Sequence, residues 1–361
     1  MRFGLFCLMP QRDRNRTVQQ IADDAIEQAR LAEALDFETV WFAEHHFSNY
    51  SVIPSPLMMA AYCAGRTNRI KLGTGVLVLP LYDPIRLIEE IAFVDQISGG
   101  RLQLGLGSGY QDYEFKHFGR NLSQSQAMFL EILDIIEAAF LSGEIAFNGA
   151  HFAIDRAALG LRPKQTPMPP IYVAGLMQNT EVQARLARSG HTPFLPQHHR
   201  PAAALTSARQ NIEDIWRSVD RPNQMRLAIQ RFAFVTRNRN EAREAAENIR
   251  YTLRLALGLR FNTAELDGAV LREGPVPNEP TLDEILEHAP IGDPTRVAEV
   301  LADDIRILRP DHLSLMMQFG SLPQPLATKS LQLLGSEVLP ILEKELGDLC
   351  TTDSNNAKRH S

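Results

Sequence analysis

Residues 70–109, IKLGTGVLVLPLYDPIRLIEEIAFVDQISGGRLQLGLGSG, hold the pattern that decides the fold. Each end of this stretch is an apolar run, and the two runs predict β-strands at 70–79 and 101–106. Between them, Asp83 is a helix N-cap and Pro84 occupies the first helical position; apolar residues then recur every three or four positions until a Gly-Gly pair ends the helix. A strand, a helix and a second strand in this order predict two parallel strands joined by a helical crossover.

The same alternation extends over most of the chain. Eight apolar runs predict strands, at 2–9, 39–43, 70–79, 101–106, 171–174, 192–195, 227–236 and 312–318. Helical patterns lie at 17–35, 56–65, 84–97, 123–141, 180–189, 202–219, 240–257, 294–308 and 327–346. Eight strands nearly all followed by helices predict an α/β fold closed into a (β/α)8 TIM barrel. An open, doubly wound sheet is the alternative that periodicity alone does not separate from it.

Two stretches interrupt this rhythm. Residues 143–170 are long and proline-rich, and residues 258–291 hold several glycines and prolines. The second stretch is too long for a connecting turn, and insertions of this kind are usually lids or disordered segments. We therefore expect a single barrel domain at 1–350, with a mobile lid insertion at 258–291 before the last units. The polar end, 351–361, is expected to be a disordered tail.

Composition excludes several classes of protein. The 361 residues carry 37 Lys and Arg against 43 Asp and Glu, a net charge of -6, which argues against a nucleic-acid or anionic-membrane partner. Three widely spaced cysteines predict neither a disulfide framework nor a zinc knuckle. No apolar run reaches about 18 residues, so no membrane-spanning helix is expected. The first residues have the pattern of a strand and not of a signal peptide, and the expected location is the cytoplasm.

In a barrel, the active site forms where the strands end. Glu44, His45 and His46 follow the strand at 39–43. Neighbouring side chains on an extended segment point to opposite sides, so one of the two rings can face the mouth of the barrel. Histidine titrates near neutral pH and suits a general base or hydrogen-bond donor. Two histidines held by ordinary loop contacts explain the pattern equally well.

A second candidate lies where the strand at 171–174 meets the next helix. Asn179 or Thr180 is the expected N-cap, and free backbone N–H groups beside a helix N-terminus suit a phosphate. An ordinary cap explains these residues as well, and on the residues alone it is favoured. His198 and His199 raise a metal alternative, but spaced ligands with carboxylates are lacking, so no metal is expected.

Several stretches together resemble the bacterial luciferase family of flavin-dependent monooxygenases. They are RFGLF at 2–6, FETVWFAEHHF at 37–47, the opening stretch at 70–109, PPIYVAG at 169–175 and IGDPTRVAEVL at 291–301. The resemblance implies a luciferase-like barrel and a group C, two-component monooxygenase. Its co-substrates would be O2 and reduced FMN (FMNH2) from a separate NAD(P)H:flavin reductase, and a flavin C4a-(hydro)peroxide would oxygenate a small organic substrate. A homodimer through the helices at 56–65 and 84–97 is also implied.

The resemblance assigns roles to individual residues. His45 maps onto the family's catalytic histidine, with Glu44 and His46 in support, and a non-prolyl cis peptide is implied between Gly75 and Val76. The residues implied to bind the cofactor are Gly75, Val76, Gly107, Ser108, Tyr110, Gly175, Leu176, Gln178, Asn179 and Thr180. Bacterial luciferase has an arginine where this chain has Ser108 and a reactive cysteine where it has Gly107, so light emission from a long-chain aldehyde is not expected.

The expected substrate pocket carries little charge. Its residues are Phe6, Met9, Tyr110, Phe194, Met317 and Phe319. Such a lining predicts a mainly apolar or heteroaromatic substrate, although Arg200 or Arg231 could bind an anionic group. Three alternatives stay open: a deazaflavin-dependent oxidoreductase of the same barrel superfamily, a non-catalytic flavin-binding relative, and a metal-dependent barrel hydrolase.

Overall fold

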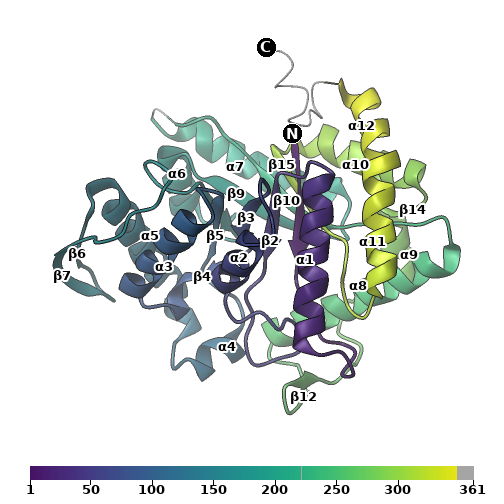
Figure 1. Cartoon of the computed structure of the whole chain (residues 1–361), viewed down its shortest axis with the longest axis horizontal. Coiled ribbons are helices and arrows are strands. Elements are labelled where there is room, and N and C mark those ends of the chain that lie inside the picture. The colour runs from purple at the N-terminus through teal and green to yellow at the C-terminus, as the bar shows by residue number, and fades with distance from the viewer. Residues whose placement is uncertain (221, 348–361) are drawn as a thin grey trace.

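Eight parallel strands close into a barrel in the computed structural model, which describes residues 1–220 and 222–347 (Figure 1). The strands are β1 (Arg2–Cys7), β2 (Thr39–Phe42), β3 (Lys71–Thr74), β5 (Leu102–Gly107), β8 (Ile171–Ala174), β9 (Thr192–His198), β10 (Ala228–Phe232) and β15 (His312–Met316). Each pairs in parallel with the next in this order, and β15 pairs with β1 to close the ring. The predicted (β/α)8 barrel is therefore confirmed, and the open sheet is excluded.

Two of the predicted strands are broken. The run at 70–79 forms β3, then β4 (Leu77–Val78) and the 3-10 turn η1 (Leu79–Leu81), and the peptide between Gly75 and Val76 is cis, as the family resemblance implied. The run at 227–236 forms β10 and then β11 (Phe234–Val235). The second piece leaves the barrel to pair with β14 (Ile291–Gly292).

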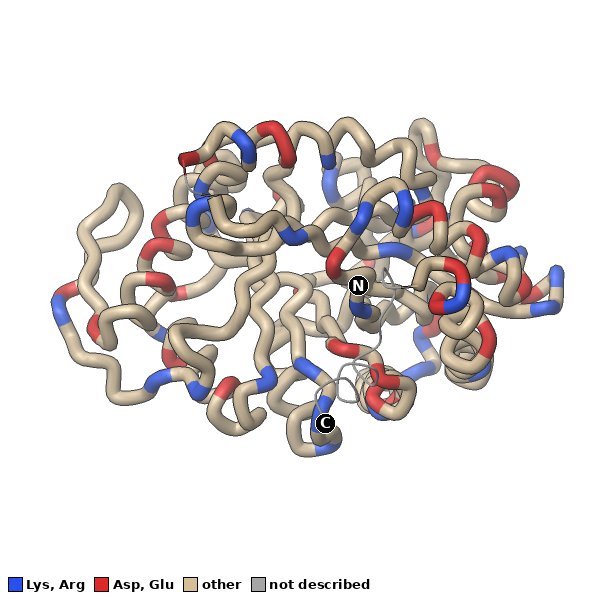
Figure 2. Tube along the Cα trace, turned by 90° about the horizontal axis from the view of Figure 1, so that it is seen from above, with Lys and Arg blue, Asp and Glu red and all other residues tan. Residues whose placement is uncertain are grey.

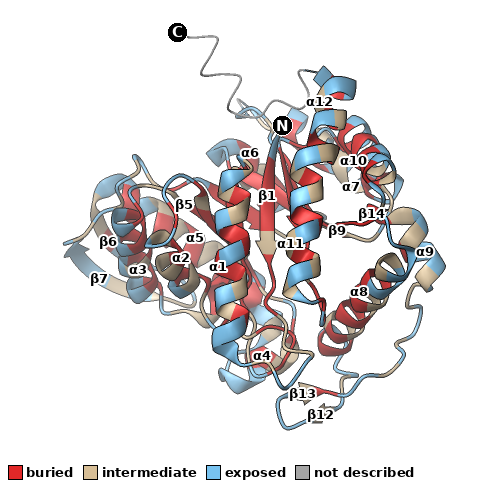
Figure 3. Ribbon diagram, turned by 45° about the vertical axis from the view of Figure 1, so that its right-hand side comes forward, coloured by how far each residue is buried: buried red, intermediate tan, exposed pale blue. Residues whose placement is uncertain are grey.

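Helices cover the outside of the barrel. They are α1 (Val18–Ala34), α2 (Pro56–Ala64), α3 (Pro84–Ile97), α5 (Ser125–Ser142), α6 (Thr180–Ser189), α7 (Thr206–Ser218), α8 (Arg239–Arg260) and α10 (Pro294–Leu308). Thr17 closes a capping box on α1, and the side chains of Asp83, Asn179 and Asp293 accept hydrogen bonds at the starts of α3, α6 and α10. The helices bury the face turned to the barrel and expose the other (Figure 3).

Several elements differ from those predicted, and some lie where none was predicted. Residues 143–170 form an antiparallel hairpin, β6 (Glu144–Asn148) and β7 (Ala153–Ala158), and α4 (Asp112–His117) follows β5. The stretch 258–291 holds a small hairpin, β12 (Leu266–Asp267) and β13 (Val270–Leu271), and then α9 (Leu282–His288). The single helix expected at 327–346 is α11 (Gln324–Leu333), a π-helical turn η4 (Leu334–Val338) and α12 (Leu339–Leu346). Short 3-10 turns η2 (Leu122–Gln124) and η3 (Ala202–Leu205) precede α5 and α7. The expected tail at 351–361 lies outside the described residues.

An aromatic plug fills the lower half of the barrel. The Trp41 ring is fully buried, and its centroid lies 4.9 Å from Tyr172, 5.1 Å from Phe194 and 5.5 Å from His312. The Trp41 indole N–H donates to His312 Nε2 over 2.9 Å. A Cβ at Gly73 would lie 2.2 Å from the Trp41 ring, so the strand beside the plug must carry glycine there. The barrel is therefore closed below, and any ligand space lies above this layer.

The surface mixes both signs of charge. Figure 2 shows Lys and Arg positions scattered among Asp and Glu positions over the trace, with uncharged stretches between them. Within the described part of the chain, no helix is long and apolar enough to cross a bilayer.

Candidate active site

Partly exposed residues lie at the carboxyl ends of β1, β3 and β8. Phe6, Gly75 and Ala174 face the barrel interior, where they meet Trp41 or its aromatic neighbours, yet each keeps partial exposure, as does Val76. The opposite wall is more covered: Phe232 is 1% exposed. The space that solvent reaches inside the barrel therefore lies toward β3 and β8.

His45 lies in the loop after β2, beside a buried carboxylate. His45 Nδ1 lies 3.1 Å from Oε1 of Glu114, a residue of α4 that is 2% exposed. The same Oε1 accepts the backbone N–H of His46 over 2.8 Å. Since a carboxylate only accepts hydrogen bonds, Nδ1 of His45 carries the proton, and Nε2 of the neutral ring is left as an acceptor. Glu114 is a candidate site residue that the sequence did not reveal.

Gln111 lies beside both His45 and Tyr110. Its amide nitrogen lies 3.2 Å from His45 Nδ1 and 3.2 Å from the Tyr110 hydroxyl, while its buried oxygen has no partner among the described residues. Because the Nδ1–H points to Glu114, the amide nitrogen of Gln111 donates to the Tyr110 oxygen. Tyr50, whose ring centroid is 4.5 Å from that of His45, hydrogen-bonds Tyr110.

Glu44 and His46 form a separate pair. Glu44 Oε1 lies 3.0 Å from His46 Nε2, and Oε2 accepts from the Tyr82 hydroxyl over 2.7 Å and from the Val78 N–H over 3.2 Å. Burial raises the pKa of Glu44, and these hydrogen bonds only partly oppose it. The His46 ring packs on Phe118, whereas the His45 ring packs on Tyr50. The two histidines therefore have different environments, and Glu44 and His46 tie the loop to β4.

The turn between β8 and α6 exposes backbone N–H groups. Gly175 and Leu176 both adopt left-handed conformations, with φ of 74° and 55°, and no atom crowds the Cβ position of Gly175. The Asn179 side chain caps α6 by accepting from Val182 N over 3.0 Å. Within the described residues, the N–H groups of 176–178 have no acceptor. The turn can therefore receive an anion.

Two further groups flank this turn. Gly107 and Ala174 are register partners, so the buried Ser108 follows directly beside Gly175. Arg260, at the end of α8, acts electrostatically on both Tyr110 and His198. Although Tyr110 is 39% exposed, the protein atoms around its hydroxyl desolvate it and raise its pKa, whereas burial lowers the pKa of His198 to about 4; the Arg260 charge lowers both. Because these residues end β5 and β9, on either side of β8, the Arg260 charge acts on the same side of the mouth.

The residues expected in the substrate pocket lie in three different clusters. Phe6 and Phe319 belong with Phe232 and Met316 in the apolar cluster at the mouth, and Phe194 is part of the plug. Met9 and Met317 instead pack in the core between barrel and helices. Strand alternation turns Met316 inward and Met317 outward, so Met316 takes the place at the mouth that Met317 was expected to fill.

The two expected anion partners are already engaged. Arg231 is fully buried on the outer face of β10, where it pairs with Asp304 of α10 over 2.9 Å. Arg200 donates to the Pro196 carbonyl over 2.8 Å. Across residues 1–220 and 222–347, no three His, Cys, Asp or Glu side chains lie close enough to hold a metal ion.

Two surface cavities of about 390 and 330 Å³ lie at the other end of the barrel. Leu227 and Asp311, which line the first, precede β10 and β15; Pro170 and Ile171, which line the second, begin β8. Neither includes His45, Glu114 or the turn at 175–180. The geometry that can do chemistry is at the carboxyl ends of the strands.

A family model described as luciferase-like monooxygenase matches residues 1–309. The chain belongs to the luciferase-like monooxygenase family. Membership confirms the resemblance seen in the sequence and supports flavin-dependent monooxygenase activity in general.

The relatives of this luciferase-like chain include proteins of both known and unknown role. Uncharacterized protein y4vJ of Sinorhizobium fredii is 36% identical over 96% of this chain and 99% of its own length. The oxygenase component of the flavin-dependent trigonelline monooxygenase of Acinetobacter baylyi is 28% identical over 69% of each chain.

Solved structures of similar fold bind more than one cofactor. Monooxygenase RslO1 of Streptomyces bottropensis matches with a TM-score of 0.81 and 22% identity over 94% of this chain and 99% of its own. The oxygenating constituent of 3,6-diketocamphane monooxygenase of Pseudomonas putida, in complex with FMN, has a TM-score of 0.73 and 20% identity over 95% and 98%. An F420-dependent secondary alcohol dehydrogenase has a TM-score of 0.72 and 18% identity over 94% and 98%. These likenesses show the fold alone.

Proposed function

We propose that the chain is the oxygenase component of a two-component, group C flavin monooxygenase that uses reduced FMN and O2 to oxygenate a small, mainly apolar or heteroaromatic substrate. The observation that carries this proposal is the buried Glu114–His45 pair, which stands at the same end of the barrel as the free amides of 176–178. Bound reduced flavin would supply the electrons that activate O2 for transfer of one oxygen atom to the substrate.

The residues present fit this cofactor. Gly75 and Ala174 are partly exposed at the ends of β3 and β8, and residues this small would leave width for a flat ring. A phosphate would lie on the amides of 176–178 with Asn179, Thr180 and Ser108 beside it. Arg260 would add a positive charge on that side of the mouth. Tyr110, Gly107, Val76 and Gln178 complete the proposed lining.

His45 would handle protons. Glu114 holds the Nδ1–H, so Nε2 is free to accept a proton from a bound reactant and to return it. Gln111 lies beside Nδ1 and hydrogen-bonds Tyr110, and Tyr50 packs against the ring. These contacts fix the plane of the imidazole, which general acid–base work requires.

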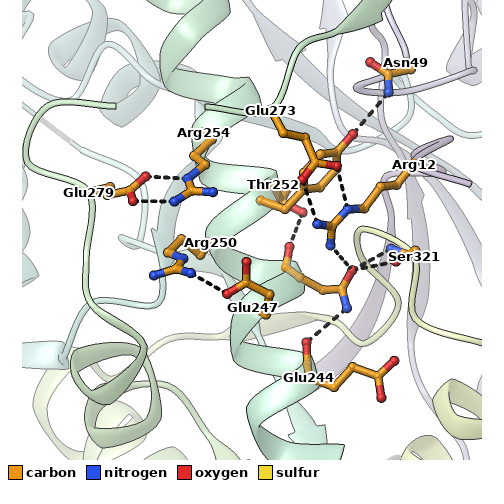
Figure 4. Close-up of polar contacts among 12 residues, drawn as sticks. Arg12, Asn49, Glu244, Glu247, Arg250, Thr252, Arg254, Glu273, Glu279 and Ser321 are labelled. Atoms are coloured by element: carbon orange, nitrogen blue, oxygen red, sulfur yellow. Dashed lines mark hydrogen bonds and ion pairs between the residues drawn. The ribbon is translucent and has the colours of Figure 1, made fainter. Parts of the chain in front are cut away.

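The segment 258–291 would be the lid. Arg12, in the loop after β1, forms two hydrogen bonds of 3.0 and 2.9 Å with the carboxylate of Glu273, and Arg254 of α8 does the same with Glu279 over 2.5 Å (Figure 4). Asn49 accepts from Leu271 N over 3.0 Å and donates its own N–H to the Ala269 carbonyl over 2.9 Å. These hydrogen bonds hold the segment 258–291 against α8 and the loops at the mouth, where it would exclude water from the reaction.

A second copy of the chain and a flavin reductase are the proposed partners. Ile85, Phe93 and Ile97 of α3 and Met58 of α2 are 44%, 55%, 50% and 70% exposed, an apolar face on the two helices implied to form the dimer. The small residues Ala60 and Ala92 on these helices are fully buried within one chain instead.

Anaerobic titration with reduced FMN, followed by mixing with oxygenated buffer, tests the proposal. We expect saturable binding, and oxidation of the bound flavin with a time course different from that of free flavin. Arg260→Ala should weaken the binding of reduced FMN more than that of reduced riboflavin, which lacks the phosphate. Binding of a reduced deazaflavin without binding of reduced FMN would refute the proposal and favour the deazaflavin alternative. Unchanged oxidation kinetics on binding would favour a non-catalytic flavin-binding relative.

A further inference from the structure

Two buried polar side chains inside the barrel lack a hydrogen-bond partner among the described residues. Gln230 of β10 and Ser314 of β15 are register partners on adjacent strands. Gln230 is 6% exposed and Ser314 is fully buried, yet the amide nitrogen of Gln230 and the hydroxyl of Ser314 have no hydrogen-bond partner among the described residues. Each buried donor left without a partner costs about 1–3 kcal/mol of stability. This cost indicates that the two side chains hydrogen-bond to a molecule that is not part of the chain.

Both side chains face the barrel interior. On β10, Ala228 packs in the plug and Phe232 in the cluster at the mouth, so Gln230 between them faces inward as well. On β15, Leu313 and Leu315 pack under the helices, and Ser314 therefore points the other way. Gln230 lies one inward position above the plug and one below the aromatic cluster at the mouth.

The pair stands across the barrel from the proposed flavin site. In the closed ring, β10 is four strands from β3, so Gln230 lies on the wall opposite Gly75. Likewise β15 is four strands from β5. A ring stacked toward β3 and β8 would leave this wall for the second reactant, which must lie between the flavin and Gln230.

The surroundings of the pair define the chemistry of that reactant. Phe232 follows on the same strand, and Phe194 is the register partner of Ala228, directly below Gln230. No Lys, Arg, Asp or Glu is among the inward-facing residues of β10 and β15, so an ionised group would be desolvated there without a counter-charge. A carboxamide offers one donor and one acceptor in a plane, which matches a carbonyl or amide edge.

We propose that Gln230 and Ser314 form the polar subsite for the organic substrate, and that this substrate is a neutral aromatic or heteroaromatic ring bearing a carbonyl or carboxamide group. This inference rests on the proposed function, because the substrate is placed against the flavin. The aromatic neighbours take the ring, and the amide with the hydroxyl orients its polar group and sets which carbon faces the flavin.

Paired probes test the subsite. Benzamide and isopropylbenzene share a ring and a similar size, but only benzamide can hydrogen-bond to Gln230. Ligand-observed NMR with protein holding anaerobically reduced FMN gives the affinity for each probe. We expect the parent to prefer benzamide, and both Gln230→Met and Ser314→Ala to weaken benzamide, Gln230→Met by about tenfold, while isopropylbenzene and reduced FMN bind as before.

Thermal unfolding separates this role from a structural one. Gln230→Met removes an unpaired polar group and should leave Tm equal or higher. The matched control is Gln103→Met, one of the inward positions at the bottom of the barrel, where the amide oxygen accepts from Thr39 over 2.8 Å; it should lower Tm.

Several results would overturn the subsite. No preference for benzamide in the parent, equal loss of both probes in Gln230→Met, or probe affinities that Gln230→Met does not change would each do so, the last indicating that the pair holds only a buried water. Weaker binding of reduced FMN by Gln230→Met, with unchanged selectivity between the probes, would assign the pair to the flavin and would also overturn the inference. If the parent protein does not bind reduced FMN, the proposed function is refuted instead. The flavin titration measures that binding independently of the two probes, so the two failures can be told apart.

Discussion

Replacing Glu114 with Gln removes one negative charge next to His45 and little else. The Gln side chain has the same shape, and its oxygen can still accept the His46 N–H that Glu114 accepts over 2.8 Å. What is lost is the charge 3.1 Å from His45 Nδ1. The amide oxygen that keeps the His46 N–H also faces Nδ1, but as a neutral and therefore weaker acceptor, so the tautomer with a free Nε2 is less strongly favoured.

The size of the effect has a lower and an upper bound. Exchanging a charge-assisted hydrogen bond for a neutral one costs about 1.4 kcal/mol, which is a factor of ten in rate. The attraction between a carboxylate and a protonated imidazole at this range is about 4 kcal/mol at an effective dielectric of 20. We therefore expect Glu114→Gln to slow the step that uses His45 by tenfold to several-hundredfold, with Tm nearly unchanged.

The assay needs no knowledge of the substrate. Protein loaded with reduced FMN is mixed with oxygenated buffer, and the rate of H2O2 release is followed in the parent, Glu114→Gln, His45→Ala and the double variant. If Glu114 acts through His45, the double variant matches His45→Ala alone. Nitrogen-15 NMR of the imidazole should show Nδ1 protonated in the parent and a tautomer mixture in Glu114→Gln. Additive rate effects, or a loss below threefold with an unchanged tautomer, would refute the reasoning.

Three further changes have defined outcomes. Arg231→Met should lower the free energy of unfolding by about 3–5 kcal/mol in urea, because the buried carboxylate of Asp304 loses its counter-charge and keeps only the Gln197 amide as a partner. The Arg231→Met/Asp304→Leu double variant should recover most of this loss, and an equal loss in both variants would contradict the prediction. Burial alone would raise the pKa of Glu38, but the hydrogen bonds and charges of His312 and Lys71 outweigh it, and the pKa is lowered overall. Ionised Glu38 therefore stabilises the fold at pH values above 4.5, the ordinary pKa of a glutamate side chain. This contribution should be lost as the pH falls below about 4.5, and Glu38→Gln should flatten the slope of stability against pH there; a parallel slope would exclude it. Arg12→Ala should break the contact with Glu273 and speed proteolysis within 266–281 up to about fivefold, since the pair is only partly buried; equal cleavage rates would show that this contact does not hold the lid.

The barrel itself was predictable because its strands are dense apolar runs and its helices have clear caps. Thr17 and Asp83 mark helix starts by local chemistry, and the structure has both caps. The helix α4 was missed because six residues, Asp112–His117, show no apolar period. The final helix breaks where Gly335 meets Leu35, at 2.6 Å from the Cβ position to the Leu35 side chain, a contact between distant parts of the chain.

The site was predictable only in part. Resemblance located His45 and the cis bond at Gly75–Val76, and the turn at 175–180 has the expected cap at Asn179. Glu114 could not be found, because its partner is 69 residues away in the sequence and nothing local marks it. The sequence predicted Met317, not Met316, in the substrate pocket. Which alternate residues of a strand face the barrel interior depends on the register with the neighbouring strands, and the sequence does not show that register.

The aromatic plug has a consequence for traffic through the molecule. Trp41, Tyr172, Phe194 and His312 pack across the lower barrel and block passage from the amino-terminal ends of the strands. Two reactants bound on opposite walls above this layer would therefore enter and leave at the same end of the barrel. Either of them could then obstruct the path of the other, so the order of binding and release would depend on this layer as well as on the residues that contact the reactants.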